Sequence, residues 1–221
     1  MIMAESFVYC PPVSPLNVLY EDDDFIVVDK TAGLLSVPGR LPQHQDSAYL
    51  RILKQYPQAK VTHRLDMATS GILLFAKHRD AEVAMSKIFQ ARTVKKQYIA
   101  LVDGKSPMQT HIDVPLITDW PNRPKQKVDF EEGKKAQTNL SLLEFDAQLN
   151  ISRVSLEPIT GRSHQLRVHL MHIGHPIMGD KLYHPHPQKF SLDRMALHAN
   201  QLEFVHPFTK KEIHIKSMPL F

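Results

Sequence analysis

The amino-acid sequence predicts one α+β domain with a largely antiparallel sheet. Short apolar segments with the two-residue alternation of strands recur along the chain and are separated by turn residues. Segments with helical spacing lie between them, at residues 46–56, 79–92 and 163–174. No repeat, low-complexity tract or linker divides the chain after residue 15. We therefore expect residues 16–221 to form the domain and the proline-containing residues 1–15 to form an irregular arm.

The composition is that of an ordinary soluble protein. The chain has 221 residues, enough to bury a real core, of which 43% are apolar and 23% are charged. Its longest clean apolar run, residues 72–76, is too short to cross a membrane, and the N-terminus has no secretory signal. Cys10 is the only cysteine, which excludes an internal disulfide and suits a reducing compartment. The sequence thus predicts a soluble cytoplasmic protein with no membrane partner.

Apolar periodicity places the individual elements. The strands are predicted at residues 18–20, 25–28, 61–63, 72–77, 97–102, 139–145, 152–157, 197–205 and 212–215. The first two form a hairpin, and the last two form a second, closing hairpin. Asp46 or Ser47 is the N-cap of the first helix, and residues 79–92 carry apolar side chains at helical spacing. Residues 115–128 are rich in proline and basic residues and predict a loop.

The segment at residues 163–174 fits two interpretations. Alternate leucine and valine residues are typical of a strand, whereas Leu166 and Leu170 also repeat with the spacing of a helix. Ser163 as N-cap and Gly174 past the end favour the helix. Because its apolar residues lie on more than one side, we expect a buried helix.

The net charge of +4 is spread unevenly along the chain. Residues 1–66 carry 6 Lys or Arg and 8 Asp or Glu, whereas residues 67–221 carry 21 and 15. A basic excess in the later part suits a polyanionic partner, although many soluble proteins without such a partner are equally basic. The 13 histidines add either positive charge or metal ligands. Charge alone therefore selects no function.

Asp66, in the segment HRLDMATSG at residues 63–71, is the first candidate for chemistry. A carboxylate that follows a strand and precedes a glycine-closed turn has a rigid support and can face a cleft. The same pattern fits an aspartate that caps the turn through hydrogen bonds to the backbone, next to Thr69 and Ser70. The pattern alone favours this structural interpretation.

Arg167, in the segment GRSHQLRVH at residues 161–169, is the second candidate. If its helix is buried, its charge needs a carboxylate partner, because an unpaired buried charge is costly. Asp66 is a candidate partner, and the pair would keep this carboxylate ionised and usable as nucleophile or base. A purely structural ion pair is equally compatible with the pattern.

Lys95, Lys96 and Tyr98, in the segment KKQYIA, are the third candidate. Two lysines beside a strand tyrosine suit phosphate contacts next to a surface on which a base stacks. A core tyrosine with lysines at the solvent-exposed end of a strand is the more common arrangement. Both interpretations stay open on the pattern alone.

Five segments in a fixed order resemble the RluA family of pseudouridine synthases: HRLDMATSG, KKQYIA, PITGRSHQLRVH, HPIMGD and LHANQLEFVHP. The resemblance covers nearly the whole chain, from about residue 18 to the C-terminus. It implies the pseudouridine synthase fold, in which helices and loops flank a central, largely antiparallel mixed sheet. It also implies Asp66 as the catalytic carboxylate, Tyr98 as the side chain that stacks on the target uracil, and Arg167 as the partner of the aspartate.

Three features place the chain within this family. Many relatives carry an S4-like RNA-binding domain before the catalytic domain, but HRLD begins here at His63, so we expect no such domain. The basic segment DWPNRPKQKV at residues 119–128 resembles that of the dual-specificity member after which the family is named. Thr31 stands where a proline is usual, which leaves the shape of that turn open but not the chemistry.

The resemblance implies isomerisation of uridine to pseudouridine in RNA, without a metal, nucleotide or redox cofactor. Asp66 would attack C1′ or take the 2′ proton, and the hydroxyl of Tyr98 could assist the later removal of the C5 proton. The target base would be flipped out of 23S rRNA hairpins or the tRNA anticodon stem-loop. We expect a monomer with no obligatory protein partner. The candidate RNA-binding residues are Arg64, Lys95, Lys96, Arg123, Lys125, Lys127 and Arg162.

Two rival functions are weaker alternatives. A metal-dependent hydrolase could use the histidines from His164 to His175, but no HExxH pattern is present. An RNA-binding protein without catalysis would not need the Asp66 carboxylate. A serine hydrolase that uses Ser70 or Ser163 is excluded, because the sequence has no GxSxG elbow.

Overall fold

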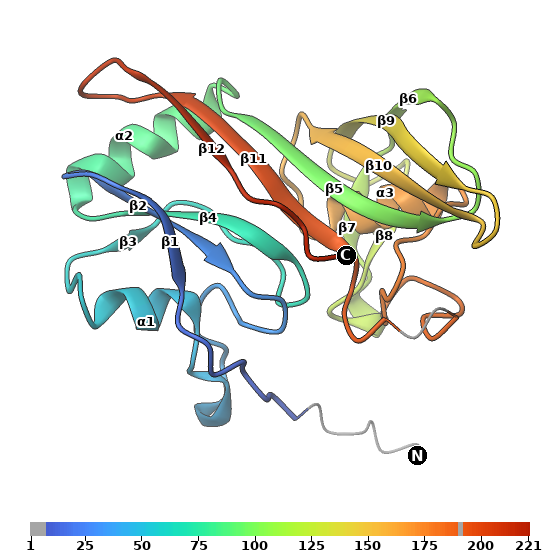
Figure 1. The fold of residues 1–221 in the computed structure, drawn as a ribbon, viewed down its shortest axis with the longest axis horizontal. Helices are drawn as coiled ribbons and strands as arrows, with labels where there is room; N and C mark the ends of the chain where they lie inside the picture. Colours follow the sequence, from blue (N-terminus) through green and yellow to red (C-terminus); the bar gives the residue numbers. More distant parts are fainter. Residues whose placement is uncertain (1–7, 190–191) are drawn as a thin grey trace.

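The computed structural model describes residues 8–189 and 192–221, in which ten strands form one large sheet (Figure 1). The order across this sheet is β1-β2-β4-β11-β5-β10-β9-β6, with β12 beside β11 and β3 beside β4. Its strands are β1 (Asn17–Glu21), β2 (Phe25–Lys30), β3 (Lys60–Val61), β4 (Ser70–Ala76), β5 (Lys95–Asp103), β6 (Gln109–Asp113), β9 (Gln137–Asp146), β10 (Ile151–Pro158), β11 (Leu197–Val205) and β12 (Glu212–Lys216). The other elements are the hairpin strands β7 (Leu116–Thr118) and β8 (Gln126–Val128), the helices α1 (Ala48–Leu53), α2 (Arg79–Gln90) and α3 (Gln165–His172), and two 3-10 turns, Pro42–His44 and Trp120–Asn122.

Near the middle of this sheet, β4 and β11 lie side by side (Figure 1). This pair is parallel, whereas the other strand pairs in the described sheet are antiparallel. Its register places Ser70 beside His198 and Gly71 beside Ala199. The predicted α+β class, with a mixed and largely antiparallel sheet, is confirmed.

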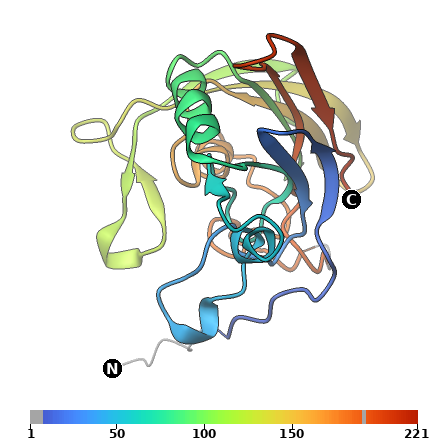
Figure 2. The ribbon, with the colours of Figure 1, turned by 90° about the vertical axis from the view of Figure 1, so that its left-hand side faces the viewer.

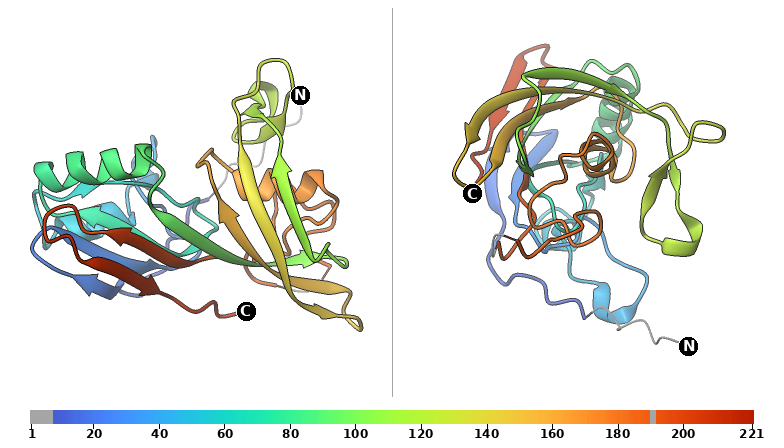
Figure 3. Two further views of the ribbon diagram at one scale, coloured as in Figure 1. Left: turned by 90° about the horizontal axis from the view of Figure 1, so that it is seen from above. Right: turned by 90° about the vertical axis from the view of Figure 1, so that its right-hand side faces the viewer.

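Each half of the sheet has its own apolar core. β2 and β4 are near-continuous apolar runs, and they are buried in the first core together with Phe204 of β11. The second core lies between β5, β10 and α3, where Leu156 and Leu170 are buried. Tyr98 of β5 packs against both cores. Helices α2 and α3 lie on the same face of the sheet, and the β7–β8 hairpin projects from that side (Figure 3).

Helices α1 and α2 begin close to their predicted starts. Ser47 is the N-cap of α1, and its hydroxyl accepts a hydrogen bond from the Leu50 N–H at 3.3 Å. His78 caps α2 through the N–H of Ala81 at 3.3 Å. Arg92, shortly after α2, takes a φ of 57°, which does not continue a helix. No helix in the described residues is long and apolar enough to cross a membrane.

The predicted loop at residues 115–128 is wrong in part, because it contains the β7–β8 hairpin. Leu116 lies opposite Val128, and Thr118 lies opposite Gln126. The prolines and basic residues between the strands obscured the short apolar segments at the two ends. These ends pack in a small cluster with residues of α3, so the hairpin is anchored at its base. Its tip stands away from the large sheet (Figure 2).

The predicted buried helix is confirmed as α3, in which the residues from Gln165 to Leu170 are all buried. The prediction of Ser163 as its N-cap is wrong. The N-cap position is held by His164, whose φ of 54° is left-handed and whose side chain makes no capping hydrogen bond. Gly174, with a φ of 81°, follows the helix as predicted.

Gly71 allows β4 to approach β11 closely. Its φ is 108°, and a Cβ atom added there would lie 2.3 Å from the carbonyl oxygen of Ala199 and 2.6 Å from its nitrogen. Both contacts are backbone atoms, which cannot move aside cheaply. The glycine that closes the Asp66 loop is therefore required by the parallel contact between the two strands.

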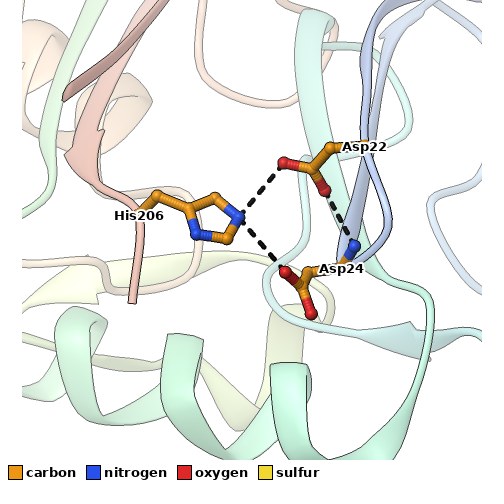
Figure 4. Close-up of side chains that lie close together, drawn as sticks. All are labelled: Asp22, Asp24 and His206. Atoms are coloured by element: carbon orange, nitrogen blue, oxygen red, sulfur yellow. Dashed lines mark hydrogen bonds and ion pairs between the residues drawn. The ribbon is translucent and has the colours of Figure 1, made fainter. Parts of the chain in front are cut away.

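Three polar side chains, Asp22, Asp24 and His206, connect the β1–β2 turn to the end of β11 (Figure 4). The Nε2 atom of His206 lies 3.1 Å from Asp22 Oδ2 and 3.5 Å from Asp24 Oδ2. Its Nδ1 atom accepts hydrogen bonds from the N–H groups of Phe208 and Thr209. The ring proton therefore sits on Nε2, between the two carboxylates, where it would have to be lost before a metal ion could bind. We interpret the cluster as a link between two turns.

The substitution Gly71→Ala is expected to lower the free energy of unfolding by more than about 1 kcal/mol, because strain at positive φ adds to the clash with β11. Gly174→Ala is the matched control, because Gly174 also has a positive φ but has open space around its Cβ position. Urea unfolding of both variants measures the difference. Equal losses would show that the close approach of the strands contributes nothing beyond backbone strain.

Candidate active site

A cleft of about 1950 Å³ brings together all three sequence candidates for chemistry. Asp66, Tyr98 and Arg167 line it, and they come from the loop before β4, from β5 and from α3. The cleft is also lined by residues from both halves of the sheet and from the β7–β8 hairpin. The two halves thus contribute jointly to one site.

The main chain around Asp66 is fixed by hydrogen bonds from outside the loop. The buried Lys30 donates to the carbonyl oxygens of Leu34 at 2.8 Å and Met67 at 3.1 Å. The N–H of Gly33 also donates to the Met67 carbonyl, at 2.8 Å. These bonds hold the main chain of Met67, the residue after Asp66. The Asp66 side chain itself is 28% exposed.

The expected contact between Asp66 and Arg167 is present. Arg167 Nη1 donates to Asp66 Oδ2 at 3.1 Å, and the arginine side chain is only 5% exposed. Its stronger contact is with Asp180, to which Nε and Nη2 donate at 2.7 Å each. Burial opposes the charged form of Arg167, but Asp180 and Asp66 outweigh it and raise the pKa of the guanidinium above its usual value.

The sequence prediction missed Asp180 as a member of the site. It stands in the HPIMGD segment, where no helical or strand periodicity indicates which acidic residue is buried. Its side chain is 1% exposed, and its Oδ1 also accepts the N–H of Leu182 at 2.9 Å. Gly179, with a φ of 73°, could have indicated a tight turn at this place.

Lys30 is a second missed residue. The sequence does not indicate its role, because a lysine within an apolar strand gives no sign of what its ammonium group contacts. Burial lowers its pKa to about 7, and the nearby charge of Asp66 opposes this shift. Its carbonyl partners give Lys30 a structural role below the Asp66 loop.

Tyr98 lines the cleft and packs against both cores. Burial raises the pKa of its hydroxyl well above the usual value, and the charge of Asp66 adds to this shift. The hydroxyl therefore keeps its proton at neutral pH, which disfavours it as a base for the C5 proton. The ring itself is available as an apolar surface beside the carboxylate.

Five of the seven predicted RNA-binding residues line the same cleft: Arg64, Lys95, Lys96, Arg123 and Arg162. Lys125 and Lys127 lie on the β7–β8 hairpin but do not line the cleft, and Lys127 pairs with Asp129 at 3.2 Å. The exposed Trp120 stands next to Arg123, whose guanidinium lies 4.5 Å from its ring centre. Positive charge thus extends from Asp66 to the hairpin.

The histidines from His164 to His175 do not form a metal cluster among the described residues. His169 contacts Thr138 and the Val114 carbonyl, and His175 contacts the Asp103 carbonyl, through their ring nitrogens. His164 instead lines the cleft, where its Nε2 atom is 3.8 Å from Asp66 Oδ2. The residues therefore do not fit the metal-dependent hydrolase.

The fold and the cleft define the class of protein. The structure is similar to human RNA Pseudouridylate Synthase Domain Containing 1, with a TM-score of 0.78 and 28% identity over 96% of this chain and 87% of that one. It has the same fold as human RNA Pseudouridylate Synthase Domain Containing 4, with a TM-score of 0.72 and 23% identity over 92% and 88%. The architecture is that of a pseudouridine synthase.

The sequence comparisons show the family. A family model described as RNA pseudouridylate synthase matches residues 24–172, so the chain belongs to this family and is an isomerase of the pseudouridine synthase class. The Escherichia coli K12 protein named Dual-specificity RNA pseudouridine synthase RluA is 52% identical over 90% of this chain and 91% of its own length. Its namesake from Pasteurella multocida is 47% identical over 96% and 98%. The resemblance found from the motifs is confirmed.

The substitution Asp180→Asn is expected to destabilise the protein by about 3–5 kcal/mol, because it leaves the buried Arg167 charge with Asp66 alone. Asp46→Asn is the control, since Asp46 pairs with Arg51 at the surface, where such a pair contributes at most about 1 kcal/mol. Urea unfolding measures both. Similar small losses in the two variants would mean that Asp180 is not needed to balance Arg167.

Proposed function

We propose that this chain converts uridine to pseudouridine in hairpins of 23S rRNA and in the tRNA anticodon stem-loop, with Asp66 as the catalytic residue. The observation that carries this proposal is an aspartate that lines a basic cleft and accepts a hydrogen bond from a buried arginine. Relatives that are 52–54% identical over about 90% of the chain are named dual-specificity synthases, which supports two classes of RNA substrate. We also propose that the chain acts as a monomer in the cytoplasm, without a protein partner.

The two oxygens of Asp66 have different surroundings. Arg167 donates to Oδ2, whereas Oδ1 has no hydrogen bond within the described residues. Oδ1 is therefore the oxygen free to react with the ribose. It would either attack C1′ or take the 2′ proton, and both routes break the bond between C1′ and N1 of uracil.

Tyr98 would hold the uracil during this reaction. Its ring lines the cleft close to Asp66, where a flipped base could stack on it. A stacked base can turn in its own plane without losing the contact. This rotation brings C5 to the position that N1 held, so that C5 can bond to C1′.

Basic residues around the cleft would bind the phosphates on either side of the flipped nucleotide. Arg64 is exposed and stands two residues from Asp66, whereas Lys95, Lys96 and Arg162 line the cleft beyond it. Trp120 is 66% exposed on the hairpin and offers a ring to an unpaired base of the loop. A stem-loop fits this arrangement because its loop bases are already unpaired and cheap to flip.

The substitution Asp66→Asn is expected to abolish pseudouridine formation and to leave RNA binding within a few-fold of the wild type. The amide keeps the shape of the side chain but is neither a nucleophile nor a base. Chemical adduct mapping of pseudouridine after incubation with 23S and anticodon stem-loops measures the product, and filter binding measures affinity. Absence of product with the wild-type protein on both RNAs would overturn the proposed function.

The affinity for a stem-loop should fall steeply with salt concentration. If four to six basic residues neutralise phosphates, the logarithm of the binding constant falls against that of salt with a slope of roughly −3 to −4. Arg123→Ala should make this slope less negative by about 0.7, whereas Arg79→Ala, on α2 and paired with Glu82, should not change it. A slope near zero would contradict the proposed RNA surface.

A further inference from the structure

His164 lies at the junction of the catalytic loop, α3 and the β7–β8 hairpin. It precedes α3 in a left-handed conformation, with a φ of 54° and a ψ of 16°, which is disfavoured for a residue with a Cβ atom. Its side chain is 12% exposed and lines the cleft. The Nε2 atom faces Asp66 Oδ2 at 3.8 Å, too far for a hydrogen bond.

The neighbouring Tyr183 determines which nitrogen of His164 carries the proton. The N–H of Gln126 in β8 donates to the Tyr183 hydroxyl oxygen at 2.7 Å. The hydroxyl in turn lies 2.7 Å from His164 Nδ1 and can donate its own proton there. Burial raises the pKa of Tyr183 to about 12, so the hydroxyl proton is present at neutral pH. A neutral His164 therefore carries its proton on Nε2.

This Nε2–H group is directed toward the cleft without an acceptor. Arg167 already donates to Asp66 Oδ2, and His164 Nε2 has no hydrogen bond within the described residues. Burial lowers the pKa of His164, while the charge of Asp66 opposes this shift and that of Arg167 adds to it. The ring is thus a neutral donor beside the reacting carboxylate, and neither the fold nor the ion pairs require its Nε2–H.

We propose that His164 is a further catalytic residue, whose Nε2–H donates a hydrogen bond to O2 of the target uracil, and that Tyr183 positions it. The inference rests on the proposed function of the Asp66 site. When the C1′–N1 bond breaks, its electron pair passes to the uracil, and the negative charge spreads over N1 and O2. A fixed donor at O2 stabilises this charge as it forms.

A neutral donor suits the second half of the reaction better than a charged one. Neutral His164 stabilises the uracil anion without giving up its proton, so the uracil ring remains nucleophilic. After rotation, C5 forms the bond to C1′, the proton on C5 is lost to a base or to water, and N1 takes up a proton from water. If Asp66 has bonded to C1′, its oxygen leaves in the same step. If it has taken the 2′ proton, that proton returns to the ribose.

Two substitutions at His164 separate its two nitrogens. His164→Gln places an amide N–H near the position of Nε2. His164→Asn places its amide near Nδ1 and so has no donor at the position of Nε2. Asparagine also tolerates a left-handed backbone. We expect His164→Asn to lower the single-turnover rate on a stem-loop by about 100-fold or more, and His164→Gln to retain most of the rate. Neither should change the dissociation constant of the RNA by more than a few-fold.

Tyr183→Phe is the companion variant, because it keeps the ring that packs 5.0 Å from Arg167 and removes only the hydroxyl. Without the hydroxyl, neutral His164 can carry its proton on either Nδ1 or Nε2. Only part of the protein then has the Nε2–H donor, so the rate should fall several-fold without a change in RNA affinity. In the double variant His164→Asn, Tyr183→Phe this further loss should vanish, since Tyr183 acts through His164. A hydroxyl with a merely structural role would lower the rate equally in both backgrounds.

The wild-type protein and Asp66→Asn are assayed alongside these variants, with thermal unfolding to confirm that each is folded. An inactive wild type would reject the proposed function itself. An active wild type with a full rate in His164→Asn would reject only the role of His164. Equal losses in His164→Asn and His164→Gln would also reject it, because the donor position would then not matter. If His164→Asn does not fold, the rates of His164→Gln and Tyr183→Phe decide the question.

Discussion

The burial of one guanidinium group governs the arrangement of the site. Arg167 lies in a helix whose central residues are all buried, so its charge has to be balanced by side chains within the protein. Asp180 balances it with two hydrogen bonds, and Asp66 contributes a third. The loop that carries Asp66 and the turn that carries Asp180 are thereby both held against α3. The first of them carries the carboxylate that faces the cleft, so the requirement of a structural ion pair also positions the group that we propose as catalytic.

The backbone of the Asp66 loop is fixed independently of this ion pair. Lys30 and Gly33 donate hydrogen bonds to the carbonyl of Met67, and Gly71 lets β4 pass close to β11 near the middle of the sheet. Because these contacts involve the main chain, the shape of the loop does not depend on the Asp66 side chain. The carboxylate is therefore held against a rigid support while one of its oxygens stays free, which is the arrangement that preorganised catalysis requires.

The sequence could predict that Arg167 needs a carboxylate partner, because a buried helix leaves an arginine few alternatives, and the family resemblance implied that this partner is Asp66. It could not predict Asp180, because burial of an acidic residue in a turn leaves no periodic pattern. The hairpin at residues 115–128 was hidden for a related reason, since prolines and charges at its tip outweigh two three-residue strands. The sequence indicated His164 only as a metal ligand in a weak rival function, because only the fold shows that its two nitrogens face a tyrosine and the cleft.

The sharing of Arg167 between two carboxylates also bears on reactivity. A cation that paired with Asp66 alone would stabilise its negative charge and so make it a weaker nucleophile or base. Asp180 takes two of the three hydrogen bonds, both at 2.7 Å, and leaves Asp66 one longer bond of 3.1 Å. In the reaction that we propose, either route would move negative charge from the carboxylate to the uracil, away from this cation. A second donor on the uracil side, independent of Arg167, would therefore lower the barrier where the ion pair cannot.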